Sequence, residues 1–200
     1  MYKGSGPRIF PILVVIIVIA LVIAALVSVG RMVFTSTGSS TTNNESTDAV
    51  LSSLHDTADS RSVRWTVRGP IVADEKFMSY QITVSPKKRT VTIYNGYLET
   101  VTSTRSYINN TKAYEQFVYA LEKANIGKTR TANGVDFRGV CATHGLAFQY
   151  ESLRDDTADH TLWTTTCTGS KGTMAANTAQ VHALFVNQIP DFSPQFDEIY

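Results

Sequence analysis

Four side chains that commonly bind metals or take part in redox chemistry lie in the C-terminal third of this 200-residue chain: Cys141, His144, His160 and Cys167. Two thiolates and two imidazoles are a common ligand set for zinc. If the cysteines are opposite partners in an antiparallel hairpin, however, odd-numbered positions share one face and both histidines lie on the other. The four ligands then do not converge on one ion. The spacing therefore favours a Cys141–Cys167 disulfide and places the histidines at the edge of the core.

A zinc site and a reactive thiol with a histidine base are the alternatives to this disulfide. Outside the cytoplasm, where the charge bias described below places the two residues, a cysteine pair forms a disulfide more often than it stays reduced. Closing a loop of 25 residues stabilises a fold by about 3 kcal/mol on the chain-entropy model. The same hairpin register predicts that Trp163 lies opposite Gly145.

A glycine-rich loop directly precedes a predicted C-terminal helix that begins near Thr173. Backbone N–H groups and the helix dipole at such a position favour an anion. The loop lacks the Gly-Lys-Ser/Thr order of a phosphate-binding P-loop, so a plain capping loop is the alternative. The residues of the possible anion-binding loop are Gly169, Ser170, Lys171, Gly172 and Thr173.

Basic residues are concentrated in one part of the chain: residues 61–138 hold 13 Lys and Arg against 6 Asp and Glu, and residues 139–200 hold 2 against 7. A basic patch there could dock on anionic lipid headgroups, an envelope polymer or nucleic acid. Mutual neutralisation of the two parts is the alternative, because the whole chain carries a net charge of only +1. Nucleic acid is disfavoured, since the basic residues do not follow a nucleic-acid motif. The candidate patch residues are Arg64, Arg68, Lys87, Lys88 and Arg89.

Recognisable catalytic motifs are absent from the sequence, which holds neither Gly-x-Ser-x-Gly nor His-Glu-x-x-His. Such motifs supply the activated nucleophile or the metal that hydrolysis needs. The acidic residues Asp155, Asp156 and Asp159 do not have the spacing of a calcium-binding EF-hand loop. We therefore predict no catalytic residues, no metal and no cofactor, and a membrane-tethered hydrolase without a recognisable motif is the alternative.

One long apolar segment precedes the part of the chain that holds these residues. Residues 9–30 carry no charge, and as a helix they span about 33 Å, which matches the hydrocarbon core of a bilayer. A secretory signal peptide is the alternative, but its apolar region is usually only about 7 to 15 residues long. We predict a single transmembrane helix that contacts the lipid bilayer through residues 9–30.

Basic residues flank this helix unevenly. Lys3, Arg8 and the free amine precede it, and Arg31 alone follows until Arg61. The positive-inside rule then predicts a cytoplasmic N-terminus at residues 1–8 and an extracytoplasmic C-terminal part. Residues 31–47 are rich in Ser, Thr and Asn, which predicts a flexible polar stalk. Residues 48–200 form the predicted extracytoplasmic domain.

Alternation of apolar and polar residues predicts four strands near residues 62–68, 78–84, 89–94 and 97–104. Asn95 and Gly96 predict a two-residue turn between the last two strands, in which Ile93 faces Leu98 and Tyr94 faces Tyr97. A helix capped by residues 109–111 follows, with Tyr114, Phe117, Val118 and Leu121 on its apolar stripe. A hairpin around residues 152–159 and a helix after Thr173 complete the domain, and a short helix at residues 48–58 precedes it. The predicted fold class is α+β with an antiparallel sheet.

The stretch from Val67 to Glu99, VRGPIVADEKFMSYQITVSPKKRTVTIYNGYLE, resembles uncharacterised single-pass envelope proteins of Saccharibacteria-type bacteria. The resemblance agrees with a membrane anchor but implies no activity and no site. The sequence thus predicts a membrane-anchored extracytoplasmic module that binds a partner protein or an anionic envelope polymer.

Overall fold

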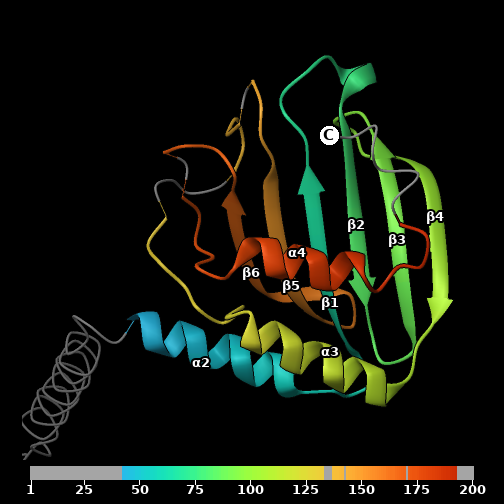
Figure 1. Ribbon diagram of the computed structural model, residues 1–200, viewed down its shortest axis with the longest axis vertical. Helices are drawn as coiled ribbons and strands as arrows, with labels where there is room; N and C mark the ends of the chain where they lie inside the picture. Colours follow the sequence, from blue (N-terminus) through green and yellow to red (C-terminus); the bar gives the residue numbers. More distant parts are fainter. Residues whose placement is uncertain (1–41, 133–136, 142, 170, 193–200) are drawn as a thin grey trace, which may run out of the picture. The chain divides into compact units, whose positions relative to one another are not determined.

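A computed structural model describes residues 42–192 apart from 133–136, 142 and 170 (Figure 1). The described part is an α+β domain with one antiparallel sheet. Its elements in chain order are α2 (Thr42–His55), β1 (Arg61–Arg68), the 3-10 helix η1 (Asp74–Lys76), β2 (Met78–Val84), β3 (Lys88–Asn95), β4 (Thr100–Ile108), α3 (Thr111–Lys123), β5 (Ala147–Arg154), β6 (Thr157–Thr165) and α4 (Thr178–Val186).

The six strands form one sheet in the order β4-β3-β2-β1-β5-β6, and all neighbours are antiparallel. Strands β1 to β4 correspond to the four strands predicted before the first helix, and they form a meander. The β5–β6 hairpin extends this meander on the other side of β1, which makes β1 a central strand. Because side chains alternate along each strand, one face of the sheet carries the apolar side chains and the other carries mainly polar ones.

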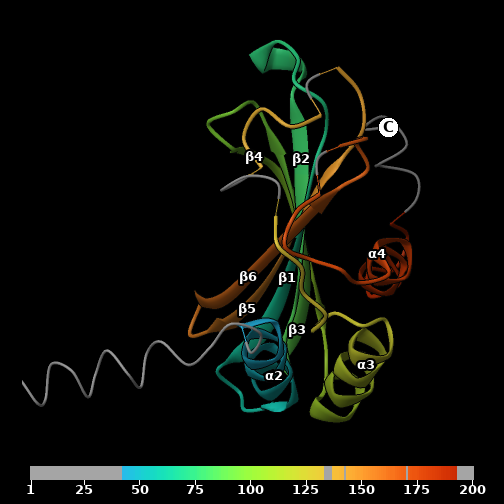
Figure 2. The same cartoon turned by 90° about the vertical axis from the view of Figure 1, so that its left-hand side faces the viewer.

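The helices of the described domain pack on the apolar face, and Figure 2 shows α3 and α4 on the same side of the sheet. The predicted stripe of α3 is confirmed, since Tyr114 and the other three stripe residues are buried. Trp65 of β1 is fully buried between the rings of Phe148 and Phe185, whose centroids lie 5.4 Å and 5.6 Å away. This aromatic stack joins β5, β1 and α4 into one core.

The face of the sheet opposite the helices is lined by hydroxyl and amide side chains. Register places a polar row across five strands, and its members are Gln149, Thr66, Gln81, Thr92 and Thr104. Some of these groups bond to neighbours, as when the Tyr94 hydroxyl donates to Oε1 of Gln81 at 3.0 Å. An antiparallel sheet commonly leaves one face polar in this way.

The predicted cytoplasmic N-terminus (1–8), the predicted transmembrane helix (9–30) and the first part of the predicted stalk lie outside the described residues. Within the described residues, no helix has both the length and the apolar character needed to cross a bilayer. Helix α2 begins at Thr42, six residues before the predicted start, so the end of the polar stretch is helical. The short helix predicted at residues 48–58 is present but ends at His55, and it buries Val50 and Leu54 in the core.

The predicted register of the β3–β4 hairpin is wrong. Ile93 pairs with Ser103 and Tyr94 with Val101, so the strands are joined by a four-residue turn rather than by two residues. Tertiary contacts select this longer turn: the Gly96 N–H donates to the Phe77 carbonyl at 2.8 Å, and the Tyr97 N–H donates to Asp74 at 2.7 Å.

The β5–β6 hairpin is tighter than predicted and begins later. Its turn is Asp155 and Asp156, both with positive φ, as in a type I′ turn. Strand β5 begins at Ala147 because Cys141 and Gly145, with φ of 58° and 92°, leave the extended conformation. Trp163 therefore pairs with Gln149, not with Gly145.

Protonation of His182 links stability to pH. The Trp65 indole donates to Nδ1 of His182 at 3.2 Å, and burial lowers the pKa of this histidine. The unfolded chain therefore binds a proton at this histidine as the pH falls below 6.5, whereas the folded chain binds it only at a lower pH. The free energy of unfolding therefore decreases as the pH drops through 6.5. We expect the melting temperature to fall more steeply between pH 7.5 and 5.5 in the wild type than in His182→Asn.

The control for this pH effect is His144→Asn, because His144 is exposed. It should leave the wild-type slope of melting temperature against pH unchanged. Parallel slopes for the wild type and His182→Asn would contradict the assignment.

Candidate functional site

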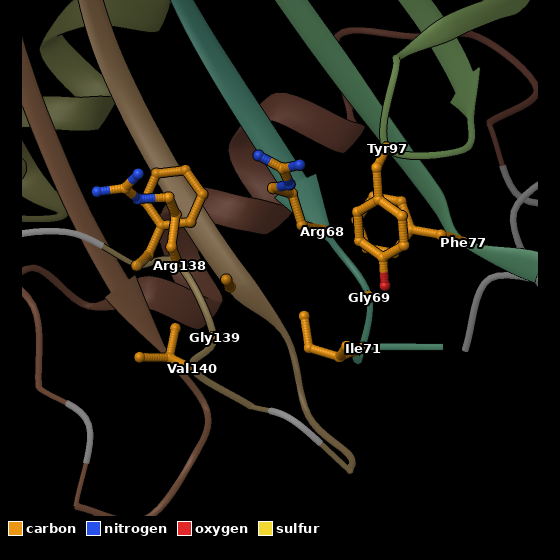
Figure 3. A pocket seen from close by; sticks show the side chains of 10 residues that line it. Arg68, Gly69, Ile71, Phe77, Tyr97, Arg138, Gly139 and Val140 are labelled. Atoms are coloured by element: carbon orange, nitrogen blue, oxygen red, sulfur yellow. The ribbon is translucent and has the colours of Figure 1, made fainter. Parts of the chain in front are cut away.

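A pocket of about 210 Å³ opens at the end of β1, where three connecting segments meet (Figure 3). The segments are the β1–β2 connection, the β3–β4 turn and the long α3–β5 connection. The lining residues are Arg68, Gly69, Ile71, Phe77, Tyr97, Phe137, Arg138, Gly139, Val140 and Ala147. Arg68 was predicted as part of a basic patch, but the pocket itself was not predicted.

The β1–β2 connection builds one wall of the pocket. Gly69 and Pro70 follow the end of β1, and the chain returns through η1 to Phe77, which is buried. The Tyr97 ring stacks on Phe77 with centroids 4.2 Å apart. The Tyr97 hydroxyl also donates to the Val72 carbonyl at 2.7 Å and accepts from the Val72 N–H at 3.1 Å. These contacts fix the aromatic pair and Ile71 on the same side of the opening.

Arg68 lies at the centre of the pocket, between Arg138 and the Phe77–Tyr97 pair (Figure 3). Its guanidinium carbon is 5.4 Å from the centroid of the Phe77 ring and 5.5 Å from that of the Phe137 ring. Both distances are within the range of cation–π attraction. The guanidinium forms an ion pair with Glu99 at 3.8 Å, which is longer than a hydrogen bond.

The opposite wall comes from the segment before the disulfide. Phe137 approaches Trp163 of β6 with ring centroids 6.3 Å apart, which ties this segment to the sheet. Val140 and Gly139 follow and face Ile71 across the opening (Figure 3). The pocket therefore combines an apolar floor with two arginine side chains.

The five predicted basic-patch residues do not form one surface. Arg68 belongs to the pocket, whereas Arg64, four residues earlier on the same face of β1, pairs with Glu151 at 3.4 Å. Lys87 pairs with Asp59 at 2.7 Å, and Lys88 lines a separate polar pocket near the β2–β3 turn. Strand alternation turns Arg89 to the helix-covered face, where it donates to the Gln188 carbonyl. Arg64 and Arg68 are separated by their spacing along β1, and Lys88 and Arg89 by alternation along β3.

The predicted disulfide between Cys141 and Cys167 is confirmed, with the two Cα atoms 5.5 Å apart. Both sulfur atoms are thus engaged with each other rather than with zinc. His144 lies on the surface, where its Nδ1 and the Thr143 hydroxyl form a hydrogen bond of 2.8 Å. His160 pairs with Ser152 on β5, away from the disulfide.

The possible anion-binding loop does not precede a helix, so Thr173 is wrong as the predicted cap. Helix α4 begins at Thr178, and the Asn177 side chain caps it by accepting from the Gln180 N–H. Gly172 instead packs tightly against the backbone of Trp163, and the Met174 N–H donates to the Trp163 carbonyl at 2.9 Å. The described part of this loop runs along the edge of β6, and Ser170 lies outside the described residues.

A polar cluster that sequence reasoning missed joins α2 to the sheet. The Arg61 side chain is 6% exposed and donates to Asp56 at 2.9 Å and to Asp159. The hydrogen bond from Arg61 lowers the pKa of Asp56. Burial alone would raise the pKa of Asp159, but the hydrogen bond and charge of Arg61 lower it. Hydroxyls of Ser53 and Ser152 bond beside this network, which holds α2 against β5 and β6.

The chemistry of the pocket suits binding more than proton transfer. The described residues that line it offer aromatic rings, aliphatic groups and guanidinium donors, and no carboxylate, imidazole or thiol. Comparison of the chain with family models, with curated proteins and with solved structures gave no match.

Proposed function

We propose that this chain is a membrane-anchored extracytoplasmic module that binds a partner protein or an anionic envelope polymer through the pocket at the end of β1. The observation that carries this proposal is the position of Arg68, which contacts two aromatic rings in an apolar pocket. Concave, largely apolar sites with a few oriented polar groups are the usual form of a binding site.

The position of the pocket in the domain supports this proposal. Strand β1 runs from Arg61, which is bonded to the α2–β1 connection at Asp56, to Arg68 at the pocket (Figure 1). Eight residues of strand span about 23 Å. The pocket therefore lies at the opposite end of β1 from the α2–β1 connection. Its lining comes from connecting segments held by the sheet, which is where binding residues are commonly found.

The disulfide supports an extracytoplasmic location, because disulfides persist in oxidising compartments and are rare in the cytosol. The predicted transmembrane segment at residues 9–30 and its flanking charges support the same location. The alternative, a membrane-tethered hydrolase, needs a base or a nucleophile at the site. His144 and His160 do not line this pocket.

Photocrosslinking in intact cells tests the proposal. A photoreactive amino acid replaces Ile71 at the pocket or, as a matched control, Ile108 at the end of β4; both side chains are exposed. We expect a discrete adduct from position 71 that position 108 does not give, and Arg68→Gln in the same chain should weaken it. Equal adducts from both positions, or none from position 71, would contradict a binding role for the pocket.

A further inference from the structure

The guanidinium of Arg68 lies near two aromatic rings. Phe77 comes from the segment that leads into β2, and Phe137 from the segment that leads toward β5, so the two rings approach from the two sides of β1. Both rings lie within cation–π range of the guanidinium, whose N–H donors point in the plane of the group. Planar donors in this fork match the two oxygens of a carboxylate.

A carboxylate of the protein itself lies near these donors. Glu99 Oε1 is 3.8 Å from Nη2 of Arg68, and the Glu99 side chain is 48% exposed. Its backbone has a φ of 55°, in the left-handed region, and its N–H donates to the Gly96 carbonyl at 3.1 Å. The turn thus holds a carboxylate close to Arg68 without a direct hydrogen bond. Exposed pairs of this length contribute little to stability and exchange readily for a better partner.

The pocket beside Arg68 has the size of one small apolar group. Its volume of about 210 Å³ is less than the range of about 300 to 1,000 Å³ that is typical for a whole drug-sized ligand. An apolar cavity of about 150 Å³ is large enough for a benzene ring. Ile71, Val140 and Ala147 supply the aliphatic part of the lining. The volume therefore suits one ring or one branched side chain next to the guanidinium.

We propose that this pocket binds an apolar group that carries a free carboxylate, and that the carboxylate takes the place of Glu99 as the partner of Arg68. The inference rests on the proposed binding function and names the chemistry of its ligand. The apolar group fills the space between Ile71 and Val140, and the carboxylate accepts from Arg68 in the plane of the guanidinium. Arg138 adds a second positive charge to the lining.

Two sources supply this chemistry: the C-terminal residue of a peptide, and a small free acid. Three probes separate them in titrations of the full chain in detergent micelles. The probes are the peptide acetyl-Gly-Gly-Phe with a free C-terminus, the same peptide as its C-terminal amide, and 3-phenylpropanoate. Methyl NMR signals of Ile71, Val140 and Ala147 report on the pocket, and the methyl signals of Ile108 provide a control remote from it.

We expect the free-acid peptide to shift the pocket methyl signals and the amide to bind at least about tenfold more weakly, because it lacks the charge-assisted hydrogen bonds. Binding of the peptide acid but not of 3-phenylpropanoate identifies a peptide C-terminus as the ligand. Equal binding of the peptide acid and of 3-phenylpropanoate shows that a carboxylate and an aromatic ring are sufficient for binding. Both results support the proposal.

Three variants locate the anion contact. Arg68→Gln should raise the dissociation constant of the acid about tenfold or more, and Arg64→Gln should leave it unchanged. Arg64 is a close match for Arg68, because it lies on the same strand and face, has 24% of its side chain exposed against 25% for Arg68, and also pairs with a glutamate. Glu99→Gln should lower the dissociation constant several-fold by removing the competing carboxylate. Thermal unfolding of each variant checks that the fold is retained.

Equal affinity for acid and amide would overturn the carboxylate inference but leave the pocket as a binding site. Equal effects of Arg68→Gln and Arg64→Gln would overturn the assignment of Arg68. Failure of all three probes to shift the pocket methyl signals would also overturn the inference. The proposed function is judged separately, by the crosslink from position 71.

Discussion

Arg61→Met should lower the free energy of unfolding by about 3 kcal/mol, because it leaves the carboxylates of Asp56 and Asp159 without their shared partner. The Arg61 side chain is 6% exposed, whereas each carboxylate side chain is 33% exposed, which places the cost at the lower end of the range for a buried ion pair. Chemical denaturation of the detergent-solubilised chain, followed by the fluorescence of the buried residues Trp65 and Trp163, measures this free energy.

Arg154→Met is the matched control for Arg61→Met. Arg154 donates to the same Asp56 oxygen at 2.9 Å, but its side chain is 53% exposed. An exposed ion pair contributes less than about 1 kcal/mol. Equal losses of unfolding free energy in the two variants would show that burial of Arg61 is not the reason why the cluster stabilises the fold.

Gly145→Ala should prevent the disulfide from forming and should destabilise the domain by about 3 kcal/mol. A Cβ at this position would lie 2.6 Å from Sγ of Cys167 and 2.9 Å from the Thr166 hydroxyl. The φ of 92° also disfavours any residue with a side chain. Titration of free thiols under denaturing conditions should find two per chain in this variant and none in the wild type.

Gly139→Ala separates the contact with sulfur from the backbone strain. Gly139 also has a positive φ, of 72°, but nothing lies within 4 Å of its Cβ position. Gly139→Ala should keep the disulfide and lower the free energy of unfolding by about 1 kcal/mol. A wild-type content of free thiols in Gly145→Ala would contradict the predicted clash. In a chain that already carries Cys141→Ala and Cys167→Ala, Gly145→Ala should cost less than it does in the wild type, because the clash with Cys167 Sγ is gone and only the clash with the Thr166 hydroxyl and the backbone strain remain.

Elements with a regular pattern could be predicted from the sequence. The alternation from Val63 to Val67 and from Met78 to Val84, and the helical stripe that begins at Tyr114, correspond to β1, β2 and α3. Each of these segments buries one face against the rest of the domain, so local pattern and tertiary packing agree.

Errors in register arose where tertiary contacts select the turn. Asn95 and Gly96 favour a two-residue hairpin locally, but the bonds of Gly96 to Phe77 and of Tyr97 to Asp74 lengthen it. Thr173 is a plausible cap by type, yet it lies alongside β6, where its hydroxyl accepts from the Trp163 N–H. These contacts join residues far apart in the sequence, so local patterns do not reveal them.

The pocket could not be predicted because its parts come from three connecting segments. Phe77, Tyr97 and Phe137 lie outside the strands, and their spacing in the sequence gives no sign that they converge on Arg68. The sequence offered one weak signal: large aromatic residues in connecting segments are usually packed against other groups and not exposed to solvent. The cluster around Arg61 could not be predicted either, because no local pattern in the sequence marks Asp56 and Asp159 as its partners.

The proposed extracytoplasmic location of the domain is the condition on which the disulfide and the proposed function both depend. Labelling of introduced cysteines with a membrane-impermeant maleimide measures it directly in intact cells. Leu98→Cys is suited to this purpose, because Leu98 is 92% exposed in the β3–β4 turn. Ser5→Cys in the predicted cytoplasmic N-terminus is the reciprocal control, and the wild type should not be labelled. We predict that Leu98→Cys reacts in intact cells and Ser5→Cys only after lysis; the opposite pattern would contradict the extracytoplasmic module.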